Sequence, residues 1–524
     1  MRPTTPTPPH AVADGWAELE TAALLGTDRR PLPGPAGPSA LLAAAGAVDR
    51  TDPAAALLDL AALTTVRRRA GARALPAPEL PEAAPPDGRR ELPAAAARRL
   101  EVLVGGRAAA GSANLAELLP QWLGAALERG YRLPSALVPA LLDAARARSE
   151  LRSEVVALAG PLGRWLAERN PDWRFVHRTA AESVAGPAGP QIWQEGLFAE
   201  RVTHLARLRR ERPAEALELL GSTWGTERAE DRVLFLDVLQ DGLGPADEPF
   251  LEAALTDRSK NVRATAAELL STLPGSALAT RMAERARTAV RLEGRRLAVS
   301  PPVECDAGMQ RDGIPPKSPT GRGERAWWFG EIVAAAPLSL WPADTGLGPE
   351  QLLRLPVGDG ESDWTDDLRE AWARAAVRQQ DADWARALLG PVPRPGHPGR
   401  TAGSPARLLS VLPAPERAAW AAAFVRAHGL GDAFQLLGAC ATPWTPPLST
   451  AVVAALERAA ASGAYPWSHS GVLGMTERAL APEAAPAVEA LAADAAPDTA
   501  WAETFTRLAG TLRFRAAMLA ELDG

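Results

Sequence analysis

Apolar residues recur at helical spacing along most of the chain, most sharply between residues 254 and 282, which read ALTDRSKNVRATAAELLSTLPGSALATRM. The larger apolar side chains of this stretch form one stripe on a helix, and they are Val262, Ala266, Leu269, Leu270 and Leu273. Pro274 and Gly275 would end the helix, and Ser276 is suited to cap the next one. We expect a turn near Asp257 and burial of Val262, Ala266 and Leu270.

The residues before this helix indicate how it could pack. Asp257 and Ser259 are both suited to cap its start, because their oxygens can accept bonds from backbone N–H groups. An Asp before the turn and Val262-Arg263 inside the helix resemble a HEAT-type repeat, a family in which Asp and Arg form a ladder between stacked repeats. The preceding helix has these residue types in a different order, as Asp231-Arg232-Val233.

Helical patterns with short turns follow one another from residue 213 to residue 292, which predicts consecutive antiparallel helices. Helicity then breaks, and residues 296–309 predict a hairpin. The predicted fold class is therefore all-α, an α-solenoid of HEAT-like helical repeats with a small β excursion near residues 293–323. The predicted parts are an N-terminal helical domain (1–185), HEAT-like repeats (186–292), a hairpin or loop insertion (293–323) and a C-terminal helical domain (324–524).

Composition narrows the class of protein. The chain has 524 residues, 47% of them hydrophobic, and a formal charge of −6, which argues against a general nucleic-acid binder. Its 57 basic residues include only two lysines, a bias typical of a GC-rich genome. Two distant cysteines, Cys305 and Cys440, argue against a disulfide framework. With no signal-peptide core at the N-terminus and no run of about 18 apolar residues, we expect a cytoplasmic protein without a membrane segment.

The motifs of common active sites are absent from the sequence. A P-loop needs Gly-Lys, whereas Ser259 precedes Lys260 and Pro316 precedes Lys317. No Gly-rich dinucleotide motif follows a strand pattern, and no hydrolase elbow or zinc-protease helix is found. The six histidines are scattered without ligand spacing, at His10, His177, His204, His397, His428 and His469. We therefore predict no cofactor and no metal, and we interpret His204 as a residue of a helix face.

An acidic stretch at residues 359–370 has two interpretations. Its acidic residues fit positions one, three, five and twelve of a calcium loop, and they are Asp359, Glu361, Asp363 and Glu370. Trp364, however, occupies position six, where the loop requires glycine. The other interpretation is a helix start, with Asp363 as its cap and Asp366 and Asp367 in its first turn, where the helix dipole favours acids.

Two groups of residues are candidates for binding a partner. The basic helix RVTHLARLRRERP carries Arg201, Arg207, Arg209, Arg210 and Arg212. It could meet an acidic partner or phosphates, or it could be a solvated face balanced by nearby glutamates. The 16 tryptophans are expected to be mostly core wedges, but Trp327 and Trp328 are adjacent. Because neighbouring residues do not share a helix face, one of them should lie at the surface or under the β excursion, where an exposed Trp often marks a partner site.

Several phrases resemble a family of uncharacterised bacterial proteins of unknown function, common in GC-rich actinobacteria. They are WAELETAALLGTDRRPLP (16–33), GRWLAERNPDW (163–173), DRSKNVRATAAELLSTLPGSALATRM (257–282) and WTPPLS (444–449). The resemblance implies a gene neighbourhood with a MoxR-type AAA ATPase, a von Willebrand factor A protein and a SWIM zinc-finger protein. It implies no catalytic residue.

Three functions remain open from the sequence. The first is a non-enzymatic scaffold or adaptor for protein–protein interaction, in which residues 296–330 contact the ATPase or its von Willebrand-type partner. The second is an enzyme with a carboxylate-based site between helices, using residues such as Glu304 and Asp306. The third is an RNA or DNA binder with an arginine-lined concave face, against which the charge balance speaks.

Overall fold

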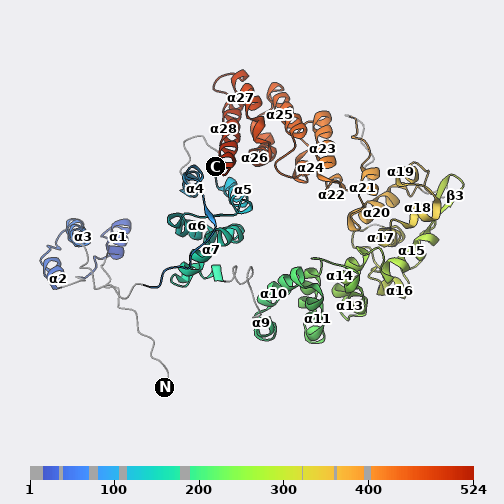
Figure 1. The fold of residues 1–524 in the computed structure, drawn as a ribbon, viewed down its shortest axis with the longest axis horizontal. Helices are drawn as coiled ribbons and strands as arrows, with labels where there is room; N and C mark the ends of the chain where they lie inside the picture. The colour runs from blue at the N-terminus through green and yellow to red at the C-terminus, as the bar shows by residue number, and fades with distance from the viewer. Residues whose placement is uncertain are drawn as a thin grey trace. The chain divides into compact units, whose positions relative to one another are not determined.

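Most of the described chain is helical, which confirms the helical prediction, and its strands form two two-stranded sheets (Figure 1). The computed structural model describes residues 16–34, 39–69, 81–105, 115–177, 189–321, 323–358, 363–394 and 403–523. The chain divides into two compact units, Met1–Ala83 and Ala84–Gly524. The predicted four-part division stays a prediction, and its first boundary lies outside the described residues.

The described residues of the first unit form three helices around a small core. They are α1 (Trp16–Leu25), α2 (Ser39–Gly46) and α3 (Pro53–Arg69). Leu19, Ala45 and Leu60 are its buried core residues. Leu24 of the same helix is exposed. The buried side of α1 carries Leu19 and Ala22, which lie one turn apart.

The second unit begins with four helices and a short parallel strand pair. The elements are β1 (Arg90–Glu91), α4 (Ala94–Gly105), α5 (Leu115–Glu128), β2 (Tyr131–Arg132), α6 (Val138–Ala147) and α7 (Arg152–Ala167). Gly130 follows α5 in the left-handed region, with φ of 70°. Helix α5 packs against α4 and α7, and α6 also packs against α7.

The C-terminal helix, α28 (Ala500–Ala520), completes the core of these first helices. Met518 and Leu522 are buried in the same core as Trp122 of α5. The hydroxyl of Tyr131 donates a hydrogen bond of 2.8 Å to the carbonyl of Leu522, 391 residues further along the chain. Arg99 forms an ion pair with Glu521 at 2.6 Å. The two ends of the second unit therefore share one hydrophobic core.

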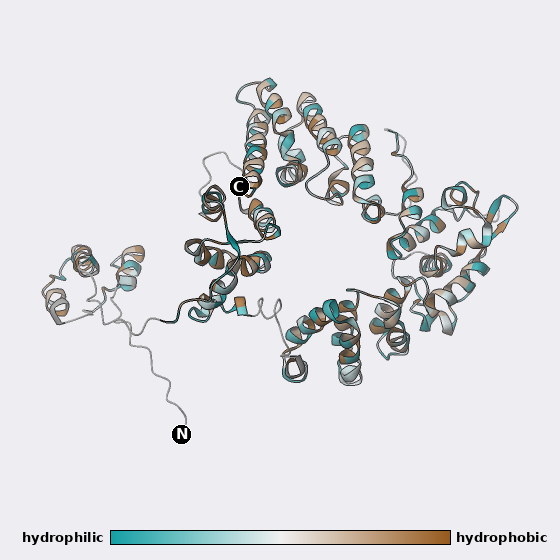
Figure 2. Ribbon diagram, viewed as in Figure 1, coloured by the Kyte–Doolittle hydropathy of each residue, from teal (hydrophilic) through white to brown (hydrophobic). Residues whose placement is uncertain are grey.

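The middle of the chain contains the helices that the sequence predicts most clearly. They are α9 (Gly189–Glu195), α10 (Phe198–Glu211), α11 (Pro213–Thr223), α12 (Ala229–Val238), α13 (Glu248–Ala254), α14 (Lys260–Ser271) and α15 (Ala277–Ala289). Helix α10 packs against α12, and α12 packs against α14. Hydrophobic and hydrophilic residues alternate around these helices, as amphipathic packing requires (Figure 2).

Helix α14 confirms the prediction for the sharpest stretch. A turn precedes it near Asp257, and Val262, Ala266 and Leu270 are fully buried. Ser276 caps α15 by accepting a hydrogen bond of 3.1 Å from the backbone N–H of Ala279. Ser259 does not cap α14 with its side chain, but the carboxylate of Asp257 accepts a hydrogen bond of 2.8 Å from the backbone N–H of Ser259 at the helix start and also pairs with Arg232 at 3.0 Å.

The β excursion is a hairpin, but it begins earlier than the sequence suggests. Strand β3 (Val290–Glu293) pairs with β4 (Arg296–Val299) in an antiparallel sheet. Gly294, with φ of 62°, supplies the left-handed conformation that a two-residue hairpin turn needs. The predicted hairpin at residues 296–309 is therefore displaced. The last residues of the predicted helical run, which ended at residue 292, belong to β3, and residues 307–311 form a short helix, α16 (Ala307–Arg311).

The remaining helices run from residue 324 to the C-terminus. They are α17 (Glu324–Ala335), α18 (Leu340–Thr345), α19 (Pro349–Leu352), α20 (Thr365–Arg378), α21 (Ala382–Leu389), α22 (Pro405–Val411), α23 (Ala414–His428), α24 (Phe434–Gly438), α25 (Pro446–Ala461), α26 (Ser470–Ala479) and α27 (Ala485–Asp494), followed by α28. Many of their tryptophans are core residues, and Trp372 and Trp444 are among the largest fully buried side chains. In the described part of the chain, no helix combines the length and the apolar character needed to cross a membrane.

Candidate functional site: a cleft beside Trp327

The segment that follows the hairpin is fixed to α14 and α15. Asp306 caps α16 by accepting a hydrogen bond of 2.7 Å from the backbone N–H of Met309. Met309 and Ile314 are buried. Gly313 has φ of 89°, and a Cβ at this position would lie only 2.5 Å from Cβ of Ala267. Glycine is therefore required here both for its backbone conformation and for the close approach to α14.

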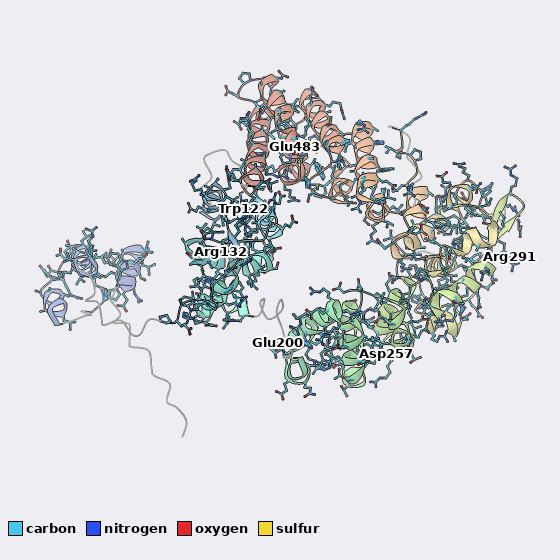
Figure 3. The ribbon with its side chains drawn as sticks, in the orientation of Figure 1. Trp122, Arg132, Glu200, Asp257, Arg291 and Glu483 are labelled. Atoms are coloured by element: carbon cyan, nitrogen blue, oxygen red, sulfur yellow. The ribbon has the colours of Figure 1, made fainter. Side chains whose placement is uncertain are left out.

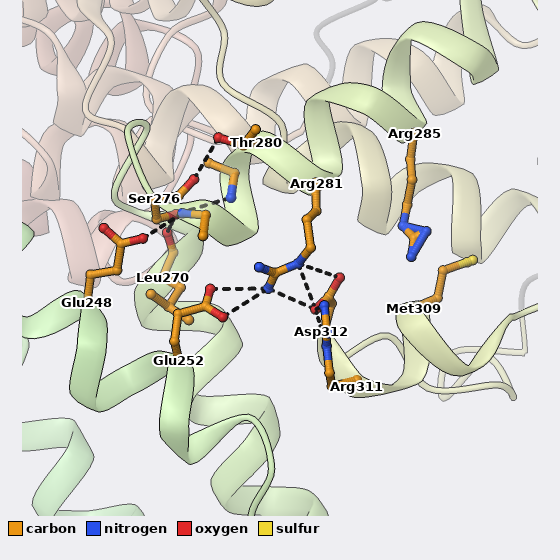
Figure 4. Close-up of polar contacts among 12 residues, drawn as sticks. Glu248, Glu252, Leu270, Ser276, Thr280, Arg281, Arg285, Met309, Arg311 and Asp312 are labelled. Atoms are coloured by element: carbon orange, nitrogen blue, oxygen red, sulfur yellow. Dashed lines mark hydrogen bonds and ion pairs between the residues drawn. The ribbon is translucent and has the colours of Figure 1, made fainter.

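Asp312 holds this segment in place through charge. Its side chain is fully buried and accepts hydrogen bonds from Arg281 at 2.9 Å and from Arg311 at 2.9 Å. Arg281 also donates to Glu252 of α13 at 3.1 Å, so one guanidinium connects two carboxylates (Figure 4). Burial alone would lower the pKa of Arg281, but its hydrogen bonds with Asp312 and Glu252 outweigh burial and raise that pKa.

A cleft of about 230 Å³ opens next to this anchor. It lies among α14, α15, α17, α20 and the segment of Asp312. Its apolar lining residues are Ala264, Ala267, Leu278, Met282, Ile314, Pro315, Trp327 and Ala335. Its charged lining residues are paired: Arg378 donates to both oxygens of Glu268 at 2.6 and 3.0 Å, and Arg374 forms an ion pair with Glu331.

The cleft is lined by apolar side chains and paired charges. No histidine or cysteine occurs among its described lining residues. Its serine, Ser271, donates its hydroxyl hydrogen to the carbonyl of Glu268 at 2.6 Å, within the same helix. The arrangement therefore offers an apolar floor and a rim of paired charges.

Trp327 and Trp328 both belong to α17, and the elements packed around this helix cover them to different extents. Trp328 is 6% exposed and belongs to the core, whereas Trp327 is half-buried and forms a wall of the cleft. Both indole N–H groups are buried without a hydrogen-bond partner among the described residues. The sequence left two positions open for one indole, at the surface or under the β excursion. Trp327 fits the second, because it lines the cleft together with Gly313, Ile314 and Pro315. Helix α17 packs against both α15 and α20, so two different faces of this helix are covered.

The basic helix α10 uses Arg209 for structure. Its guanidinium is buried in an ion pair with Asp247, where the side chains are 1% and 3% exposed. It also donates to the carbonyl of Asp241 at 2.8 Å and to that of Gly242 at 3.1 Å, just beyond the end of α12. Arg209 therefore neutralises a buried carboxylate and satisfies backbone acceptors after a helix terminus.

The other arginines of the basic stretch, in α10 and just after it, do not form one open basic surface. Arg201 forms an ion pair with Glu227 and lies over the ring of Trp193, 4.5 Å from its centre. Arg207 is half-buried, with its guanidinium 3.3 Å from Nδ1 of His204. Arg210 and Arg212 are exposed, and they face Asp241 at 3.7 Å and Glu215 at 2.7 Å.

His204 is a buried residue of α10. Burial is the main cause that lowers its pKa, and the positive charges of Arg207 and Arg212 lower it further. The candidate carboxylates Glu304 and Asp306 do not form a desolvated pair, because both are exposed and Asp306 caps α16.

The acidic stretch near residue 363 starts a helix. The side chain of Asp363 accepts a hydrogen bond of 2.9 Å from the backbone N–H of Thr365, and Asp366 and Asp367 lie in the first turn of α20. Asp359 and Glu361, like His10 and His397, lie outside the described residues. Within the described ranges, no group of three or more His, Cys, Asp or Glu residues could hold a metal ion.

The cleft itself was not predicted from the sequence. Glu268 and Arg378 are 110 residues apart, and neither belongs to a motif. A weak signal was available in the Asp312-Gly313 dipeptide, which is typical of a turn that needs a left-handed residue.

Comparison with known proteins gives a family but no function. A model described as a family of unknown function, DUF5691, matches residues 18–522. No curated protein and no solved structure matches the chain. Because the match covers nearly the whole sequence, the chain belongs to the DUF5691 family of unknown function.

Proposed function

We propose that this protein is an α-solenoid of HEAT-like repeats that serves as a scaffold or adaptor for protein–protein interaction. A series of ion pairs between neighbouring helical layers supports the repeat interpretation. Arg209 of α10 pairs with Asp247, which precedes α13. Arg232 of α12 pairs with Asp257, which precedes α14 and is labelled in Figure 3. Arg281 of α15 pairs with Glu252 of α13.

These pairs would favour one fixed stacking of the helices. A buried charge that loses its partner is strongly destabilising, so an arrangement that separates the pairs is disfavoured. Two of the helices that line the cleft, α14 and α15, take part in this series through Arg232–Asp257 and Arg281–Glu252. A rigid framework of this kind is suited to presenting a preformed surface to a partner.

The cleft beside Trp327 is the observation that carries the proposal. Its volume of about 230 Å³ is below the roughly 300–1,000 Å³ of pockets for small molecules and cofactors. It is suited in size to one or two side chains of a protein partner. The apolar floor would contact an apolar side chain, and the Glu268–Arg378 pair at the rim would contact polar groups around it.

The partners follow from the resemblance and form part of the proposal. They are a MoxR-type AAA ATPase, a von Willebrand factor A protein or a SWIM zinc-finger protein, met in the cytoplasm. Residues 296–330 contribute to the contact through Trp327 and the exposed tip at residues 315–321. Met309, Asp312 and Ile314 of this segment are buried and have a structural role.

Affinity purification from the native host tests this proposal. Tagged wild-type protein is compared with Glu268→Arg, which places a second positive charge beside Arg378 at the cleft. The matched control is Glu350→Arg, because Glu350 also pairs with an arginine, Arg354, at 3.3 Å but does not line the cleft. Deletion of residues 316–321 tests the tip without removing any buried residue.

The expected result is that a protein partner co-purifies with wild type and with the Glu350 variant, and is depleted with the Glu268 variant. Circular dichroism confirms that all variants keep their helical content. A wild-type protein that captures no partner above a tag-only control contradicts the scaffold function. A partner that is retained equally by all variants contradicts the cleft as its site.

A further inference from the structure

A group of exposed aromatic side chains lies far along the sequence from the cleft. Tyr465 and Trp467 are 65% and 75% exposed, and Phe434 is 49% exposed. In the described part of the chain, these three are the aromatic residues classed as exposed. Trp, Tyr and Phe are otherwise covered in this protein, so their clustering between residues 434 and 467 calls for an explanation.

The Tyr465 and Trp467 rings are held in a defined arrangement. Their planes differ by 22° and their centres lie 6.3 Å apart. Pro466 between them is buried and begins a 3₁₀ turn, Pro466–His469. The backbone N–H and the hydroxyl of Ser468 both donate to the carbonyl of Tyr465, at 3.1 and 2.6 Å. The turn therefore presents two nearly parallel rings to solvent on a fixed backbone.

Phe434 is the first residue of α24, a short helix that precedes this turn in the chain. Its ring contacts Gly471 in the first turn of α26, where a Cβ would lie 3.1 Å from a ring carbon. Helices α24 and α26 pack against each other, which brings Phe434 to the helix that the Tyr465–Trp467 turn leads into. We call Phe434, Tyr465 and Trp467 the aromatic patch.

The turn that carries the Tyr465–Trp467 pair has no charged residue other than His469, whereas Asp432 lies two residues before Phe434. Residues 463–471 read GAYPWSHSG and contain no Asp, Glu, Lys or Arg. A phosphate backbone or a strongly acidic or basic segment would find no complementary charge in this turn. The chemistry therefore fits an uncharged ligand that packs on aromatic ring faces.

We propose that the aromatic patch binds a proline-rich, extended segment of a partner protein. Proline rings pack on exposed aromatic faces, and a polyproline II helix is already ordered before binding, so little conformational entropy is lost. Such a helix makes no internal hydrogen bonds, and the Tyr hydroxyl and Trp N–H can donate to its carbonyls. This inference rests on the proposed scaffold function and specifies the chemistry of one partner.

Fluorescence anisotropy with a fluorescein-labelled decaproline peptide tests this directly on the purified full chain. We expect saturable binding to wild type. Trp467→Ala should weaken binding roughly 30-fold, as for an interface hot spot of about 2 kcal/mol. Tyr465→Ala should weaken it in the same direction, and Trp467→Phe should keep much of the affinity because a ring face remains. The matched control is Leu197→Ala, which alters another side chain that is 75% exposed, on a different element.

Three results would overturn the proposal. The first is no binding of decaproline to wild type up to about 1 mM, the weak limit of specific recognition. The second is equal binding by wild type and by Trp467→Ala that circular dichroism shows to be folded. The third is concentration-dependent dimerisation of wild type that Trp467→Ala abolishes, which would assign the patch to a second copy of the chain. The peptide assay contains no native partner, so a negative result there contradicts only the proposed ligand of the aromatic patch. The co-purification experiment tests the scaffold function independently.

Discussion

Replacing Arg209 by Met should disrupt the helices around it far more than the same change at its neighbour Arg210. Both residues belong to the basic helix that the sequence offers as a binding surface, but the structure separates them. Arg209 is buried against Asp247, whereas the Arg210 side chain is 69% exposed and faces Asp241 at 3.7 Å. The pair of variants therefore distinguishes a structural arginine from a surface arginine on one helix.

The magnitude follows from what Arg209→Met leaves behind. The carboxylate of Asp247 would lose its charge partner while it stays 3% exposed, although it still accepts a hydrogen bond of 2.9 Å from the backbone N–H of Gly244. The carbonyls of Asp241 and Gly242 would lose their donor as well. Breaking a buried ion pair from one side costs about 3–5 kcal/mol. Arg210→Met should stay within about 0.5 kcal/mol, as for most surface substitutions.

Hydrogen–deuterium exchange read by mass spectrometry is the suitable assay, because a chain with several cores need not unfold in one step. Peptides from α10 to α13 in Arg209→Met should exchange faster by roughly a hundredfold to several thousandfold, since 1.4 kcal/mol is a factor of ten. Peptides from α25 to α27 should be unchanged and serve as the internal control. Exchange in α10 to α13 that matches wild type would refute the structural role of Arg209.

Three further changes probe other parts of the fold. Leu270→Ala removes a fully buried side chain of α14 and should cost about 2–5 kcal/mol by chemical denaturation, whereas Leu234→Ala at an exposed position should cost under about 0.5 kcal/mol. The pKa of His204 is lowered in the folded state, so the unfolded state takes up the proton first as the pH falls. The melting temperature should therefore decline below about pH 6.5, and this decline should be smaller in His204→Gln. Leu522→Ala should increase hydrogen exchange in α5 but leave α14 unchanged, because Leu522 belongs to the core of α4–α7.

The sequence predicts local structure in this protein better than it predicts contacts. The helical stripe of α14 repeats over several turns, so its burial could be read from spacing alone. The end of α15 could not be predicted from spacing. Val290–Glu293 continues the helical pattern and becomes a strand only by pairing with Arg296–Val299. Pairing between segments is a tertiary effect that local propensity does not contain.

The candidate site was predicted only in part, for the same reason. Trp327 was identified because adjacent tryptophans are unusual, but its burial depends on α15 and α20, which pack on either side of α17. The arginines of α10 are not distinguished by their sequence context. Arg209 nevertheless forms a hydrogen bond with Asp247, which lies 38 residues further along the chain, and Arg210 does not. Charge patterns alone do not separate a buried ion-pair partner from a solvated side chain.

The two proposed binding surfaces differ in charge, so salt should separate their contributions. The rim of the cleft carries the Glu268–Arg378 pair, in which the Glu268 side chain is 57% exposed and open to ions. Raising the ionic strength from about 0.15 M to about 1 M shortens the screening length from about 8 Å to about 3 Å, which should weaken a polar contact at that rim. The turn that carries Tyr465 and Trp467 has no acidic or basic residue other than His469, so decaproline binding should change little over the same range. Measurements of both interactions at the two salt concentrations check this. A peptide affinity that falls with salt as steeply as partner binding would show that the aromatic patch depends on charge after all, and the choice of an uncharged proline-rich ligand would then be wrong.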